Sequence, residues 1–259
     1  MPCKQVTNGS NRMNDARGFT LVEIAISIAV SLIMIFAIGM AIESASRSSG
    51  GIERKVTAQQ DVRGALEIMA LEIKMASYNP TLADNALIWR NTDCTGPPAA
   101  NPAYKGIQEA TANSITVEMD ISDGLGGDGQ GTLTDANEII RYEFVQTGND
   151  RYITRETINC GSVPPSGGAQ PFLGDTIASG RPRTVRVINA GGDVNVPVFR
   201  YFDGQGLELL GVGRNCMPGC SADIRMIEIT LAVETEEIDP STDQTRRMIY
   251  KTRETLRNN

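Results

Sequence analysis

The chain has 259 residues, enough for one large domain or two small ones, and its 41% hydrophobic and 21% charged residues are ordinary for a protein with a sizeable core. Its formal net charge of −7 argues against nucleic-acid binding, which needs a basic surface, so we expect no nucleic-acid partner. Histidine is absent, which excludes Ser-His-Asp and Cys-His catalysis, and no motif supports a carboxylate pair, a Ser-Lys dyad or a redox cysteine; we therefore predict no enzyme and no cofactor.

The first predicted element is a long apolar helix near the N-terminus. Residues 19–42 read FTLVEIAISIAVSLIMIFAIGMAI and carry one charge, Glu23. As a helix they would be about 36 Å long, against a hydrocarbon core of about 30 Å. Lys4, Arg12 and Arg17 precede this stretch, so the positive-inside rule keeps the N-terminus in the cytoplasm and exports the rest. We expect a single-pass inner-membrane helix followed by an extracytoplasmic head.

Two simpler interpretations of this helix stay open. A secretory signal peptide cut near residues 44–46 would have an apolar region of about 7 to 15 residues, shorter than this one. A plain signal anchor fits the length but leaves Glu23 unexplained, because a carboxylate in hydrocarbon is unfavourable and marks a functional site.

The residues around Glu23 carry a resemblance. Arg17 to Glu23 read RGFTLVE, which resembles the type III signal of type IV prepilins and pseudopilins. The resemblance implies a leader of residues 1–18, with Met13 as an alternative start, and cleavage by a prepilin peptidase between Gly18 and Phe19. It also implies methylation of the Phe19 amine and a role for Glu23 in filament assembly.

The opposite charges of the Phe19 amine and the Glu23 carboxylate give a physical reason for a glutamate at this position. A free α-amino group is a cation at neutral pH, and methylation leaves its charge in place. We expect the Glu23 carboxylate to pair with the Phe19 amine of a neighbouring subunit, because a buried charge left alone would cost about 3 to 5 kcal/mol. The alternative is that Glu23 extends to the membrane interface from the first helical turn.

The next predicted elements are a hinge and an amphipathic helix. Residues 44–51 read SASRSSGG, and each glycine is about 1 kcal/mol less favourable than alanine in a helix, so we predict a hinge or local melt there. An apolar stripe then follows helical spacing on a helix from about Ile52 to Ser77, formed by Val62, Leu66, Met69, Ile73 and Ala76. We expect this half to lie against a sheet; a coiled coil would need more heptads.

Beyond Pro80 the pattern changes to strands. Alternating apolar and polar side chains predict antiparallel strands at 114–119, 138–144, 152–156 and 184–188, a hairpin over 198–210, and a last pair at 225–234 and 247–256. The predicted fold class is α+β, pilin-like: a long N-terminal helix, half transmembrane and half amphipathic, packed on an antiparallel head. The predicted parts are residues 1–18, 19–51 and 52–259.

A second resemblance concerns the subtype. Residues 61–81 read DVRGALEIMALEIKMASYNPT, similar to the helix end of PilW-like minor pilins, with Ser77 where that group has glycine. Residues 256–258 are similar to the C-terminus of the same group. Unlike major pilins, which usually have a proline near the place of Met40, this chain has Gly39-Met40.

The resemblance implies a minor type IV pilin in the initiation or at the tip of pilus assembly. Its partners would be the prepilin peptidase, the major pilin and other minor pilins or pseudopilins, the inner-membrane assembly platform and, before assembly, membrane lipid. The mature protein would end in an extracellular or periplasmic filament. A J-type minor pseudopilin of a type II secretion system and a pilus-tip adhesin remain alternatives.

Cysteines of the exported part predict disulfides. The chain has five, and removal of a leader containing Cys3 leaves Cys94, Cys160, Cys216 and Cys220. An even count in an exported domain favours disulfides, with three connectivities. The Pro-Gly turn between Cys216 and Cys220 favours that pair, and hence Cys94 with Cys160. A zinc site of four thiolates is the alternative, although such sites usually need two close pairs.

An acidic, glycine-rich stretch from Asp120 to Glu138 raises the hypothesis of a calcium site, because calcium takes several oxygen ligands. It lacks the EF-hand spacing. The simpler interpretation is a solvated loop between strands, so we predict no metal.

Overall fold

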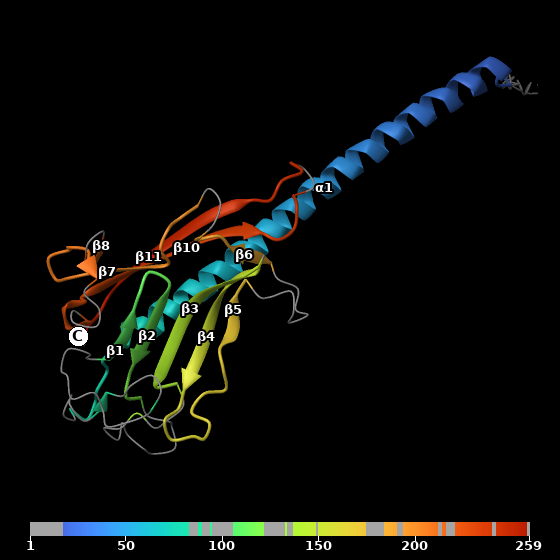
Figure 1. The fold of residues 1–259 in the computed structure, drawn as a ribbon. Coiled ribbons are helices and arrows are strands. Elements are labelled where there is room, and N and C mark those ends of the chain that lie inside the picture. The colour runs from blue at the N-terminus through green and yellow to red at the C-terminus, as the bar shows by residue number, and fades with distance from the viewer. Residues whose placement is uncertain are drawn as a thin grey trace, which may run out of the picture. The chain divides into compact units, whose positions relative to one another are not determined.

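The computed structural model describes residues 18–82, 88–89, 94, 106–121, 133, 137–148, 150–174, 184–190, 194–211, 214–215, 221–239 and 242–257. The chain divides into two units, residues 1–48 and residues 49–259. The second unit contains every strand of the described residues and the second part of the long helix (Figure 1).

One helix, α1 (Leu21–Lys74), includes both helical stretches that the sequence predicts. The predicted melt at residues 44–51 is wrong, because the structure has these residues in α1, whereas the predicted hinge stays a prediction. Helix propensity is a weak prior that neighbouring contacts override. Gly51 is buried, and a Cβ on it would lie 2.6 Å from Oδ1 of Asp239, so packing explains a glycine that propensity alone makes unfavourable.

The larger sheet covers one side of the α1 segment in the second unit (Figure 1). Its five antiparallel strands follow the order β1-β2-β3-β4-β5. Their bounds are β1 (Ile107–Ala110), β2 (Ser114–Glu118), β3 (Ile139–Thr147), β4 (Asp150–Ile158) and β5 (Gln170–Leu173). The predicted strands at 114–119, 138–144 and 152–156 are confirmed as β2, β3 and β4. The short edge strands β1 and β5 lack a long alternating pattern and were not predicted.

The second sheet is built around one long strand. β10 (Met226–Thr235) pairs along its length with β11 (Arg247–Thr255), and along its other edge with β7 (Phe199–Phe202) and β6 (Val185–Val187). Two further short strands, β8 (Leu210–Gly211) and β9 (Arg214–Asn215), pair with each other, and a short 3-10 helix, η2 (Ser221–Asp223), precedes β10. The predicted last strand pair is confirmed as β10 and β11.

The predicted hairpin over 198–210 is confirmed at its turn. Glu208 bridges Phe202, and the N–H of Leu209 donates to the carbonyl of Tyr201 at 2.8 Å. Asp203 Oδ1 accepts from the backbone N–H groups of Gln205 and Leu207, both at 2.8 Å. An aspartate at the start of a turn makes such bonds to its own loop.

The main core lies between the buried face of α1 and the inner faces of both sheets. The helix and the turn directly after it supply the apolar stripe that the sequence predicts, with Ala58 and Ala65 added: Val62, Leu66, Met69, Ile73 and, in the turn, Ala76. β10 is the central strand of its sheet, and residues on both of its faces are buried. The fold is therefore α+β, with the amphipathic part of the helix against antiparallel sheets.

A smaller apolar cluster lies where β3 begins and β4 ends. Trp89 and Ile88 are buried there with Leu133, Ile139 and Ile158. Cys94 and Cys160 pack against this cluster and form a disulfide with a Cα–Cα distance of 5.3 Å. This is the pairing that the sequence favours; Cys216 and Cys220 lie outside the described residues.

Candidate functional site: the N-terminal segment

The start of α1 is a capping box. Thr20 is the N-cap residue, because it directly precedes Leu21 and its carbonyl accepts a hydrogen bond from the N–H of Ile24 at 3.2 Å. The N–H of Glu23 donates to Oγ1 of Thr20 at 3.2 Å. In return, the backbone N–H and the hydroxyl of Thr20 both donate to Oε2 of Glu23, each at 2.9 Å. Two backbone donors at the helix start, otherwise without partners, are thereby satisfied reciprocally.

This arrangement explains why glutamate suits the position. The carboxylate lies in the first turn of α1, where the partial positive charge of the helix end stabilises an anion. The pattern Thr-x-x-Glu is a sequence signature of a capping box, and here it is Thr20-Leu21-Val22-Glu23. Thr20 is thus the residue of this site that the sequence analysis missed, although the signal was available.

The helix that follows is apolar, and its large side chains are exposed in the part of the chain that the structure describes. Phe19 is 84% exposed, and the large apolar side chains from Leu21 to Ile42 are all at least half exposed or nearly so. Among the described residues, α1 is the one helix long and apolar enough to cross a membrane. Ser27 and Ser31 turn their hydroxyls back to the carbonyls of Glu23 and Ser27, both at 2.7 Å, which satisfies these groups without water.

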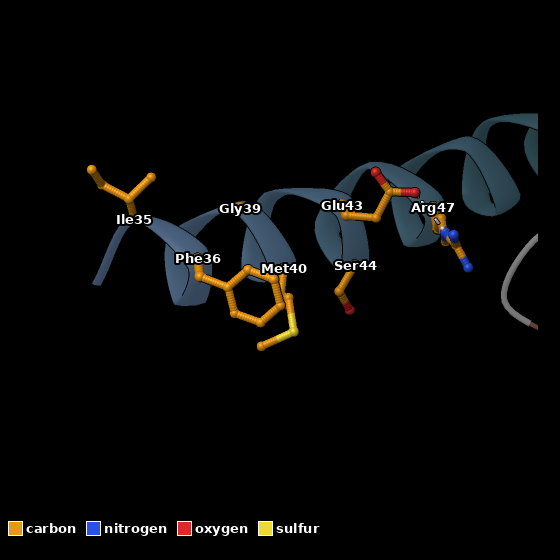
Figure 2. Close-up of a pocket in the computed structure, with 7 residues that line it drawn as sticks. All are labelled: Ile35, Phe36, Gly39, Met40, Glu43, Ser44 and Arg47. Atoms are coloured by element: carbon orange, nitrogen blue, oxygen red, sulfur yellow. Dashed lines mark hydrogen bonds and ion pairs between the residues drawn. The ribbon is translucent and has the colours of Figure 1, made fainter. Parts of the chain in front are cut away.

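A shallow depression lies on the helix surface where the apolar stretch gives way to polar residues. Figure 2 shows it beside Gly39, with Phe36, Met40 and Ser44 on one side of the helix. Gly39 contributes no side chain, and a Cβ there would have no atom within 4 Å. Glu43 and Arg47 form an ion pair at 3.0 Å immediately beyond Ile42, and both side chains are more than 60% exposed. The pair begins the polar part of α1.

No other candidate site of the described residues competes with this segment. Among them, no group of three or more cysteine, aspartate or glutamate side chains could hold a metal ion. Asp120 and Glu138 are both buried, and Oε1 of Glu138 accepts from the N–H of Ile121 at 3.2 Å. Residues 122–132 between them lie outside the described residues, so the calcium hypothesis concerns a loop that the structure does not describe.

Comparison with known proteins concerns the same segment. Residues 13–42 match the family model described as the prokaryotic N-terminal methylation motif. The chain carries a prepilin-type methylation motif. No curated protein and no solved structure matches the chain.

The methylation motif unites the two features of the N-terminal segment. It includes Gly18, Phe19, the capping box of Thr20 and Glu23, and the apolar helix up to Ile42. Together they support a precursor of the type IV pilin or pseudopilin kind, with an N-terminal helix able to anchor it in a membrane. Such precursors are structural subunits that a prepilin peptidase processes and that assemble into pilus-like filaments.

Proposed function

We propose that this protein is a minor type IV pilin-like subunit that acts in the initiation or at the tip of pilus assembly. Residues 1–18 are its leader, residues 19–51 its membrane and filament-core helix, and residues 52–259 its exported head. One observation carries the proposal: the methylation motif leads directly into an apolar helix whose side chains are exposed and which therefore needs lipid or other helices around it.

Processing takes place between Gly18 and Phe19. Both residues precede α1 and are exposed, so the scissile bond lies in non-helical chain that a peptidase can reach. Cleavage leaves Phe19 with a free amine, which is then methylated and keeps its positive charge. The new N-terminus lies one residue before the capping box.

Glu23 then has two roles that do not compete. Both bonds from Thr20 go to Oε2 of Glu23, so Oε1 keeps its acceptor sites for a further donor. A carboxylate can accept about four hydrogen bonds in all. In the single subunit the capping box stabilises the charge; in the filament the methylated amine of a neighbouring Phe19 adds an opposite charge. The pairing selects subunits in register.

The partners follow from the same chemistry. The helix is surrounded by inner-membrane lipid before assembly and by the helices of major and minor pilins or pseudopilins afterwards. The assembly platform in the inner membrane transfers it from one surrounding to the other. The head lies outside the cytoplasm in both states, where its Cys94–Cys160 disulfide persists.

Mass spectrometry of the mature N-terminus tests the proposal. In cells with the prepilin peptidase, the expected N-terminal residue is an N-methylated Phe19; in cells without it, the leader stays attached. A different first residue in peptidase-containing cells would contradict the cleavage site. Pilus number and type II secretion measured in a deletion strain then separate a minor pilin from a J-type pseudopilin, since only the first predicts a loss of pili alone.

A further inference from the structure

The turn that joins β10 and β11 contacts α1 at Gly51, the second of two consecutive glycines. Asp239 of this turn is buried and lies against Gly51 of the helix. A Cβ on Gly51 would be 2.6 Å from Oδ1 of Asp239, closer than non-bonded carbon and oxygen atoms approach, and 3.1 Å from its Cγ, which is a tight contact. The neighbouring Gly50 is in open space, since a Cβ there would meet nothing within 4 Å. Only one of the two glycines is therefore required by packing.

Arg246 holds the Asp239 side chain at Oδ2, while Oδ1 is the atom nearest to Gly51. Arg246 donates from Nε to Oδ2 of Asp239 at 2.6 Å and also approaches with Nη2 at 2.5 Å. The backbone N–H of Asp239 donates to the carbonyl of Gln244, and its carbonyl accepts from Asp243 at 2.8 Å. The backbone bonds close the turn around Asp239, and its carboxylate cannot rotate away from Gly51 without breaking its bonds to Arg246.

A second contact joins the turn to the next residues of the helix. Arg54 donates from Nη1 to the carbonyl of Ile238 at 2.8 Å, and its Nε forms an ion pair with Glu237 at 2.7 Å. Arg54 is three residues beyond Gly51, so the two contacts lie about one helical turn apart. Helix and turn thus meet at two points on the same face.

We propose that residues 237–239, the β10–β11 clamp, hold the glycine turn of α1 in helical conformation, and that the helix around Gly50 and Gly51 unwinds when the clamp is released. The sequence SRSSGG before Ile52 has weak helix formers, so its helicity depends on tertiary contacts. The clamp supplies those contacts from a turn nearly two hundred positions later in the chain. The inference concerns the helix itself and does not depend on the proposed assembly role.

Hydrogen exchange of the full chain in detergent micelles tests the clamp. In Arg54→Met the peptide spanning residues 44–57 should exchange about tenfold faster, because a local opening free energy lower by about 1.4 kcal/mol gives that factor. Arg63→Met is the matched control: Arg63 is exposed on the same helix outside the clamp, so exchange should stay unchanged. Equal exchange in the two variants would overturn the proposal.

The two glycines provide an independent pair of variants. Gly50→Ala and Gly51→Ala raise helix propensity equally, but only the second places a methyl group against Asp239. Gly50→Ala should slow exchange of the same peptide, and Gly51→Ala should speed it. If both slow it alike, the clamp does not hold this turn. Exchange in β3 and β4, together with the fluorescence of buried Trp89, reports whether the head is folded; where a variant disturbs these, the arginine pair decides.

Discussion

The guanidinium of Arg155 on β4 forms two parallel hydrogen bonds with the carboxylate of Glu72 on α1, Nη2 to Oε1 at 2.8 Å and Nε to Oε2 at 3.2 Å. The phenol of Tyr142 on β3 donates to the same Oε2. The side chains of Arg155 and Glu72 are 24% and 15% exposed, so water screens the pair only partly. This cluster fixes the rotation of the helix against the larger sheet. The pKa of Tyr142 is raised, most strongly by burial, then by the hydrogen bond to Glu72 and then by the negative charge of Glu72.

The first prediction concerns this pair. A double-mutant cycle with Glu72→Gln and Arg155→Met should give a coupling energy of about 2 kcal/mol, since the bonds are bidentate and mostly buried. Chemical unfolding followed by the fluorescence of Trp89, the single tryptophan, measures it. The matched control is Lys74 with Glu254, which are 4.0 Å apart and more exposed. That pair should give about 0.5 kcal/mol or less; equal couplings would contradict the assigned role of Glu72.

The second prediction concerns Ser77 at the end of the helix. Its φ of 62° lies in the left-handed region, which favours glycine, and Gly106 packs against its backbone. Ser77→Gly and Ser77→Ala both remove the hydroxyl, but only glycine relieves the backbone strain. Ser77→Gly should therefore be more stable than Ser77→Ala by about 1 kcal/mol. Thermal unfolding compares the two, and equal melting temperatures would argue that strain at this position is absent.

The third prediction is a loss of stability in acid through Glu228 on β10. Burial raises the pKa of Glu228, but hydrogen bonds from Arg253 at 2.7 Å and Arg200 at 3.1 Å and the charge of Lys251 outweigh it and lower the pKa. Because the folded-state pKa lies below that of the unfolded chain, this stabilisation is present above the unfolded pKa of about 4.3 and is lost as the pH falls through the folded pKa.

Glu228→Gln measures this effect. The variant should be less stable by about 2 kcal/mol at neutral pH, a value below that of a fully buried pair because Arg253 and Lys251 are more than half exposed. The difference in unfolding free energy should shrink as the pH falls below about 4. A difference that stays constant with pH would show that the charge of Glu228 contributes nothing.

The fourth prediction separates the two roles of Glu23. Glutamine can replace glutamate in a capping box, whereas its neutral amide cannot balance the charge of a cationic amine. Glu23→Gln should therefore keep the helix start but fail to enter filaments, while Thr20→Ala should fray the first turn at a cost of about 1 kcal/mol. Subunit incorporation and helix content by circular dichroism are the two measurements. Normal incorporation of Glu23→Gln would refute the pairing and leave capping as the role of Glu23.

The fifth prediction concerns the Cys94–Cys160 disulfide. These residues are 66 positions apart, so the chain-entropy account gives a loss of about 4 kcal/mol when both become serine. The smaller cluster that the disulfide borders contains Trp89, which is 1% exposed. Reduction should therefore shift the tryptophan emission to longer wavelength before the larger sheet unfolds. Unchanged emission after complete reduction would mean that the cluster holds without the disulfide.

Local signals in the sequence determined much of this molecule. The motif RGFTLVE and the uninterrupted apolar stretch depend only on neighbouring residues, so the N-terminal helix and its methylation motif are readable without a fold. The stripe from Val62 to Ala76 is equally readable, because its apolar residues follow helical spacing. The strands β2, β3, β4, β10 and β11 are readable because their apolar and polar side chains largely alternate. Thr20 and Glu23 also belong here, because a capping box spans four consecutive residues.

Tertiary structure decided what depends on contacts between distant residues. The glycines at 50 and 51 predict a break by propensity, and the helix nevertheless continues because Asp239 and Arg54 bring the β10–β11 turn against it. A glycine in a helix costs about 1 kcal/mol relative to alanine, which packing and hydrogen bonds from the turn offset. The pairing of Glu72 with Arg155, 83 positions apart, was likewise unreadable, since a sequence shows which side chains are charged but not which of them meet.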